Sequence, residues 1–133
     1  LIVFDEAHKY MGNPELSEQI ASAIRQMRHQ GVSIVLASQD PMSLPNSVIE
    51  LSSVIIMHRF NSPRWLKHIQ KSIVALGDLT PEKMAALKPG EAYIWASRAT
   101  STHFTQRAMK VTIRPRVTLH GGATTHAQRK SEE

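Results

Sequence analysis

Two acidic residues follow the first apolar segment of the chain. Residues 1–4 are all apolar and partly β-branched, which predicts a buried parallel strand, and Asp5 and Glu6 come directly after it. Ligands of open α/β sheets bind outside the carboxyl ends of the strands, so we expect both carboxylates at a ligand-binding edge. One carboxylate can hold hydrated Mg²⁺ against phosphate charge while its neighbour orients or deprotonates an attacking water. The pair therefore indicates nucleotide hydrolysis, and its structural alternative is an acidic pair that caps a helix.

A second polar signal follows the next predicted strand. Residues 32–37 are largely apolar, and Ser38 and Gln39 come at the end of this segment. The amide of Gln39 can donate to a terminal phosphate oxygen and accept a hydrogen bond from the lytic water. Two strands that present Asp-Glu and Ser-Gln at matching ends favour nucleotide hydrolysis more strongly than either pair alone.

The elements that position these residues alternate between strand and helix. Asn13-Pro14 predicts the start of a helix that ends at Gly31, and residues 54–58 predict a third strand. Further helices are expected after the proline-containing loop 40–45, at Ser62-Pro63, and from Thr80-Pro81 to Gly90. The order strand, helix, strand, helix, strand predicts an α/β fold with a parallel sheet and flanking helices.

The C-terminal third changes to a two-residue period. Residues 92–96 and 104–113 predict an antiparallel hairpin joined by the polar loop 97–102. Residues 119–133 contain few apolar side chains, so we expect one domain over residues 1–118 and a disordered tail.

Composition narrows the class of protein. The 133 residues suit one modest domain, and no apolar run approaches the roughly 18 residues that span a bilayer. With no cysteine, disulfides and thiolate metal sites are excluded, which fits a reducing compartment such as the cytoplasm. The net charge is +5, and no acidic residue lies between Glu91 and Glu132. This basic C-terminal half permits a polyanionic partner such as nucleic acid, or it is a solvated surface.

Three segments resemble a known superfamily. Residues 1–8 (LIVFDEAH) resemble a Walker B segment. Residues 28–32 (RHQGV) and 37–41 (ASQDP) resemble the segment after Walker B in the HerA/FtsK superfamily of DNA-translocating ATPases. The likeness is greatest to HerA-type ATPases of bacteria and archaea. It covers residues 1–60 well and residues 87–94 more loosely.

The resemblance implies a fold and a set of roles. It implies part of a RecA-like P-loop NTPase domain, from Walker B onward, with ATP and Mg²⁺ as cofactors. In such an enzyme Asp5 is the magnesium-side acid through water, Glu6 the catalytic base and Gln39 the phosphate sensor. Arg28 corresponds to the arginine that one subunit offers to its neighbour's nucleotide. The implied partners are further copies in a hexameric ring, double-stranded DNA that moves through it, and a nuclease or other effector protein.

One departure from the superfamily is large. Its phosphate-binding loop, G-x-x-x-x-G-K-[ST], is absent, because no Gly-Lys pair occurs in the sequence. That loop belongs to an earlier strand, so we expect the chain to be the C-terminal portion of such a domain and inactive by itself. A binding or assembly module without ATPase activity is the competing interpretation.

Asp5-Glu6-Ala7-His8 also spells the motif of DEAH-type helicases. Those enzymes continue with a Ser-Ala-Thr segment and a second RecA-like domain, whereas this chain has Ala-Ser-Gln and too few residues for another domain. A DEAH-type helicase fragment is therefore the weaker alternative, and we expect His8 to be a local hydrogen-bonding residue.

A basic stripe is expected on the helix that begins at Ser62-Pro63. The apolar face of that helix carries Trp65, Ile69 and Ile73, and the opposite face carries basic residues at helical spacing: Arg64, Lys67, His68 and Lys71. These side chains can contact DNA phosphates, or they are a solvated helix face.

Overall fold

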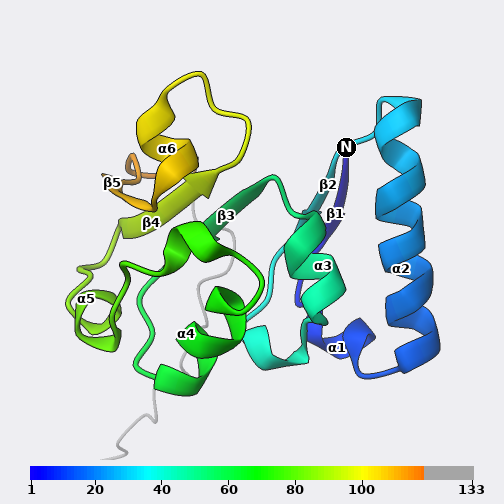
Figure 1. The fold of residues 1–133 in the computed structure, drawn as a ribbon, viewed down its shortest axis with the longest axis horizontal. Helices are drawn as coiled ribbons and strands as arrows, with labels where there is room; N and C mark the ends of the chain where they lie inside the picture. Colours follow the sequence, from blue (N-terminus) through cyan, green and yellow to red (C-terminus); the bar gives the residue numbers. More distant parts are fainter. Residues whose placement is uncertain (119–133) are drawn as a thin grey trace, which may run out of the picture.

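The computed structural model describes residues 1–118, except for the side chain of Arg28. The domain boundary and the disordered tail predicted at residues 119–133 fall outside the described part of the chain. The predicted α/β class is confirmed: strands and helices alternate along most of the chain, and two small sheets lie side by side with helices around them (Figure 1).

The first sheet is a parallel pair. Strands β1 (Ile2–Phe4) and β2 (Ile34–Leu36) run in the same direction, with Ile2 opposite Ile34. The connection between them consists of α1 (His8–Met11), α2 (Pro14–Met27) and a 3₁₀ turn, η1 (Arg28–Gln30). The predicted ends of this connection are confirmed. Asn13 Oδ1 accepts the N–H groups of Glu15 and Leu16, and Gly31 closes the turn with a φ of 69°.

The second sheet is antiparallel, in the order β3 (Val54–Met57), β4 (Glu91–Ala96) and β5 (Met109–Thr112). Along the chain, η2 (Pro41–Ser43) and α3 (Asn46–Leu51) connect β2 of the first sheet to β3 of the second. Between β3 and β4 the chain forms α4 (Pro63–Gln70), η3 (Val74–Leu76) and α5 (Pro81–Ala85), and α6 (Thr102–Gln106) precedes β5.

Side-chain caps start the helices where the sequence predicted. Ser62 Oγ accepts the N–H of Trp65 at 3.4 Å, and Thr80 Oγ1 accepts that of Lys83 at 3.2 Å. Proline stands at the first turn of both helices, where its missing N–H costs no hydrogen bond.

The core lies between the helices and the antiparallel sheet. Leu66, Leu76, Met84 and Leu87 are almost completely buried and pack in one cluster with Trp95 of β4. Gln70 closes the turn beneath them, because its Nε2 donates to the carbonyls of Leu76 and Leu79 at 2.8 and 3.0 Å. No helix in residues 1–118 is long and apolar enough to cross a membrane.

The structure refines the expected sheet. The third predicted strand, β3, is not bonded to β2; it pairs antiparallel with β4, with Val54 opposite Ala96. The predicted hairpin pairs as expected, with Ile94 opposite Met109, but its second strand is shorter. Residues 102–106 form α6 instead, and Trp95 Nε1 donates to the carbonyl of Thr105 at 3.0 Å. This bond satisfies the indole N–H, which a buried tryptophan requires.

Glu91, the first residue of β4, makes two polar contacts at the start of this strand. Its carboxylate accepts the N–H of Lys88 at 2.7 Å and pairs with the ammonium group of Lys110 at 3.0 Å. These two contacts, the backbone N–H first, hold the pKa of Glu91 below its usual 4.5. A lowered pKa in the folded state means that the carboxylate stabilises the fold above the unfolded-state pKa, and that this stability is lost as the pH falls through the folded-state pKa.

We therefore expect Glu91→Gln to lower the Tm at pH 7, and we expect the difference from wild type to shrink as the pH falls below 4.5. Thermal melts followed by circular dichroism across this pH range measure the effect. Glu50→Gln is the control, because Glu50 is exposed on α3 and makes no ion pair within residues 1–118. A Tm difference for Glu91→Gln that stays constant down to about pH 2 would contradict the expectation.

Candidate functional site

The carboxyl ends of β1 and β2 form one continuous edge. Ala37 N–H donates to the carbonyl of Phe4 at 2.9 Å, and Ala7 N–H donates to the carbonyl of Ala37 at 2.8 Å. These bonds continue the parallel pairing past the last residue of each strand. They bring the Asp5-Glu6 turn together with the segment that carries Ser38 and Gln39, as the sequence predicted.

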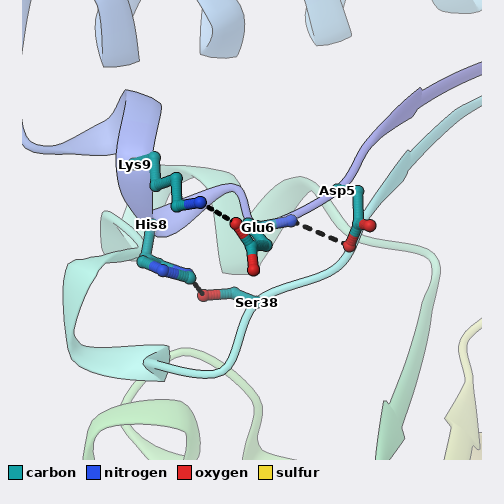
Figure 2. A network of polar contacts seen from close by, with 5 residues as sticks. All are labelled: Asp5, Glu6, His8, Lys9 and Ser38. Carbon is teal, nitrogen blue, oxygen red and sulfur yellow. Dashed lines mark hydrogen bonds and ion pairs between the residues drawn. The ribbon is translucent and has the colours of Figure 1, made fainter. Parts of the chain in front are cut away.

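Glu6 has an unusual backbone conformation. Its φ is +50°, and it is the one non-glycine residue with a positive φ in the described part of the chain. The left-handed region is unfavourable for a side chain with a Cβ and persists only where the surroundings enforce it. Here Asp5 Oδ1 accepts the N–H of Glu6 at 2.9 Å (Figure 2). The carbonyl of Glu6 accepts the N–H of Lys9, also at 2.9 Å. Backbone strain of this kind is concentrated at functional sites.

The carboxylate of Glu6 pairs with the ammonium group of Lys9, one helical turn further along the chain (Figure 2). The hydrogen bond from Lys9 and its positive charge hold the pKa of Glu6 below the usual value, and they raise the pKa of Lys9. Glu6 is therefore ionised at neutral pH, as a general base must be.

His8 and Ser38 join the two segments through their side chains. His8 Nδ1 lies 3.5 Å from Ser38 Oγ, and the Ser38 hydroxyl donates to the carbonyl of Asp40 at 3.0 Å (Figure 2). At this distance the contact is a weak hydrogen bond, and the tautomer of His8 decides which of the two atoms donates. The local hydrogen-bonding role expected for His8 fits this geometry.

Gln39 is exposed next to this network. Its side-chain amide makes no hydrogen bond within the described part of the chain, so both its donor and its acceptor face solvent. An amide in this state can bind a phosphate oxygen and a water at the same time.

The acidic turn fits hydrated Mg²⁺. Asp5 is exposed, and its Oδ1 holds the N–H of Glu6, while its other oxygen has no partner among residues 1–118. Magnesium bound with nucleotides commonly uses one or two carboxylates and keeps several waters. No cluster of three or more His, Asp or Glu side chains that could hold a metal ion occurs in this part of the chain. The remaining ligands would therefore have to be phosphate oxygens and water.

Arg28 is not part of the same edge. The helix α2 leads from the carboxyl edge of β1 back to the start of β2, and the backbone of Arg28 follows its last residue (Figure 1). The residue therefore lies at the opposite end of the strands from Glu6. The side chain of Arg28 is outside the described part of the structure.

The basic stripe on α4 is smaller than the sequence predicted. Arg64, Lys67 and Lys71 are exposed, and we call these three residues the α4 stripe. His68 does not belong to it, because its Nε2 lies 2.8 Å from the carbonyl of Leu44 and its side chain is half-buried. Trp65 is partly buried and lies outside the core cluster, and the centroid of its ring is 5.8 Å from that of Phe60.

Sequence reasoning missed Lys9. The i, i+3 spacing of Glu6 and Lys9 is a signal for an ion pair on a helical turn, and it was available in the sequence. The positive φ of Glu6 has no comparable signal, because glutamate rarely adopts it and only the tertiary structure imposes it.

The comparisons with known proteins concern the fold. No protein-family model matches the sequence, and no curated protein matches it. The structure is similar to that of the genome packaging NTPase B204 from Sulfolobus turreted icosahedral virus 2 in complex with AMPPCP, with a TM-score of 0.60 and 24% identity. That match covers 86% of this chain and 52% of B204.

A second match is B204, the DNA-packaging ATPase from Sulfolobus turreted icosahedral virus, with a TM-score of 0.64, 24% identity, and coverage of 85% and 51%. The chain thus spans about half the length of the solved structures that it matches. At this identity the likeness establishes the fold, and the function has to be argued from the site.

The ion pair at Glu6 gives a direct test of the site's electrostatics. Lys9→Met removes the charge and the hydrogen bond that lower the pKa of Glu6, so we expect that pKa to rise toward 4.5. Titration of the side-chain carboxyl carbon by NMR measures it. Lys67→Met, on the exposed face of α4, is the matched control and should leave Glu6 unchanged. An unchanged pKa of Glu6 in Lys9→Met would show that the pair does not form in solution.

Proposed function

We propose that this chain supplies the hydrolytic half of an ATP site in a DNA-translocating ATPase of the HerA/FtsK type. The observation that carries the proposal is the shared edge of β1 and β2, where an ionised Glu6 with an enforced backbone lies beside the segment of the unpaired Gln39. The fold likeness supports it, because the similar structures are genome-packaging NTPases and one is in complex with AMPPCP.

Each residue of the edge has one task in this proposal. Glu6 accepts the proton of the attacking water, and Gln39 donates to the terminal phosphate and orients that water. Asp5 would hold Mg²⁺ through water, and the ion would neutralise phosphate charge. Exposed ion pairs are weak, so Lys9 can release the Glu6 carboxylate to a bound water.

The phosphate cradle has to come from outside these 133 residues. No Gly-Lys pair is present, and about half of each similar structure lies outside the match. We therefore expect no ATP turnover by the isolated chain. Activity has to be measured on a polypeptide that contains these residues together with a phosphate-binding loop.

The position of Arg28 favours action between subunits. A residue at the opposite end of the strands cannot reach the Glu6 of its own chain, but in a ring it can face the nucleotide of a neighbouring copy. The proposal therefore includes a ring of identical subunits, with the hexamer as its expected form and double-stranded DNA as the substrate that moves.

Glu6→Gln tests the hydrolytic role. The amide keeps the shape of the side chain but cannot take the proton of water, so we expect ATP binding to persist and turnover to fall by about 10²–10⁴-fold. Steady-state phosphate release and nucleotide-binding titrations measure the two quantities, and Glu50→Gln is the matched control. Full turnover by Glu6→Gln would refute the assignment. Binding without turnover in the wild type would favour the competing module that binds or assembles without hydrolysis.

Mixed rings test the role of Arg28. Arg28→Ala should itself abolish most turnover, because an arginine finger is worth about 10³–10⁵-fold in rate. Rings that combine Arg28→Ala with Glu6→Gln subunits should regain activity at interfaces where an intact Glu6 meets an intact Arg28. Mixed rings that stay as inactive as either variant would argue against a role between subunits.

The α4 stripe tests the DNA partner. A translocase has to accept any sequence, so its contacts are expected to be with phosphates, and each phosphate contact contributes about 0.9 to the slope of log affinity against log salt. Reversing the charge of all three stripe residues should weaken DNA-stimulated turnover and lower that slope. Equal stimulation and an equal slope would assign the stripe to solvation. A control with the same charge change reverses three other exposed residues: Lys83, Lys88 and Arg107.

A further inference from the structure

Gln39 depends on its neighbours for its position. Neither its main chain nor its side chain makes a hydrogen bond within the described part of the chain. On the amino-terminal side the nearest anchor is Ala37, whose N–H donates to the carbonyl of Phe4 and whose carbonyl accepts the N–H of Ala7. The backbone is therefore fixed to the β1 segment two residues before Gln39.

Asp40 is the anchor on the carboxyl-terminal side. Its Oδ1 accepts the N–H of Met42 at 3.0 Å, and its carbonyl accepts the hydroxyl of Ser43 at 2.7 Å. Pro41 follows it, and a residue before proline is restricted to extended backbone, which Asp40 adopts with a φ of −122° and a ψ of 96°. The chain is therefore fixed again one residue after Gln39.

The side chain of Ser38 connects these two anchored parts. Its hydroxyl donates to the carbonyl of Asp40 at 3.0 Å and accepts the N–H of Asp40 at 3.2 Å. In the structure of residues 1–118 no other hydrogen bond links residues 37–38 to residues 40–43. Ser38 is half-buried and also lies 3.5 Å from Nδ1 of His8, whereas Gln39 is exposed (Figure 2). One buried hydroxyl thus closes the backbone around an exposed amide side chain.

We propose that Ser38 is the positioning residue of Gln39. Its hydroxyl fixes the backbone from which the Gln39 amide reaches a phosphate oxygen and the attacking water, and it acts on the reaction through Gln39 alone. Catalytic groups must be held closely in place, since a displacement of about 1 Å can cost about 10²-fold in rate. The kinetic part of this inference rests on the proposed function, and the structural part does not.

Relaxation of ¹⁵N nuclei in this chain tests the structural part. We expect an order parameter of about 0.85 for the Gln39 N–H in the wild type and a value below about 0.6 in Ser38→Ala. Ser38→Thr keeps a hydroxyl and should keep the wild-type value. Ser38→Cys keeps the size of the side chain with only a weak donor and acceptor, so it provides the same comparison if the alanine variant does not fold.

Ser43→Ala is the matched control. It removes a hydroxyl from the same Asp40 carbonyl, but at a residue beyond Gln39, so the order parameter of Gln39 should not change. An equal loss of order in Ser43→Ala and Ser38→Ala would overturn the inference, because Gln39 would then depend on the stability of the whole turn. Equal order in Ser38→Ala and the wild type would also overturn it, as would a Ser38→Thr variant that is as mobile as Ser38→Ala.

A double-mutant cycle tests the kinetic part in a polypeptide that also contains a phosphate-binding loop. We expect Ser38→Ala to lower kcat by about 10–10²-fold with KM nearly unchanged, and Ser38→Thr to retain most of the wild-type kcat. In a Gln39→Ala background the Ser38→Ala change should cause no further loss, because the group that Ser38 positions is gone.

The outcomes separate this inference from the proposed function. A full additional loss from Ser38→Ala in the Gln39→Ala background overturns the inference, because Ser38 would then act independently of Gln39. Lost order in Ser38→Ala with an unchanged kcat also overturns it. Full turnover by Gln39→Ala would instead refute the task of Gln39 in the proposed function, and the order parameters alone would then decide whether Ser38 fixes Gln39.

Discussion

The candidate site depends on two backbone hydrogen bonds beyond the ends of β1 and β2. The bonds from Ala37 to Phe4 and from Ala7 to Ala37 extend the parallel register into the turns that carry the polar residues. Without them, Glu6 and Gln39 would belong to two independent loops. Because these bonds involve main-chain groups, they leave the side chains of Asp5, Glu6 and Gln39 available for other contacts.

The electrostatics of this edge follow from its exposure. Glu6 keeps a lowered pKa through one neighbouring lysine, and not through a buried network, so the carboxylate remains open to solvent. An exposed pair constrains a side chain weakly. The enforced backbone of Glu6 supplies the constraint that the ion pair cannot, since it fixes the point from which the side chain starts.

Features that depend on neighbouring residues could be predicted from the sequence, whereas features that depend on contacts between distant segments could not. Helix starts at Asn13, Ser62 and Thr80 depend on neighbouring residues only, and all three caps form. The strands form two sheets because β3 pairs with β4 and not with β2. The apolar sequence of β3 predicts a strand, but it does not specify which strand it pairs with. The same limit applies to α6, because the hydrogen bond from the Trp95 indole to the Thr105 carbonyl is a tertiary contact that no local pattern indicates. It also explains His68. Helical spacing predicts this residue on the exposed stripe, but its contact with the Leu44 carbonyl keeps the side chain half-buried.

The distribution of the core links the fold to the site. The largest fully buried side chains include Leu66, Leu76, Met84 and Leu87, all beside the antiparallel sheet, whereas Val3 and Val35 of the parallel pair are about half exposed. The candidate site thus lies on the less buried part of the molecule. Burial of apolar surface contributes about 25 cal/mol per Å², so the cluster beside the antiparallel sheet supplies more hydrophobic stabilisation than the parallel pair does. At the edge of β1 and β2, where Asp5 and Gln39 are exposed, main-chain hydrogen bonds hold the two segments together instead.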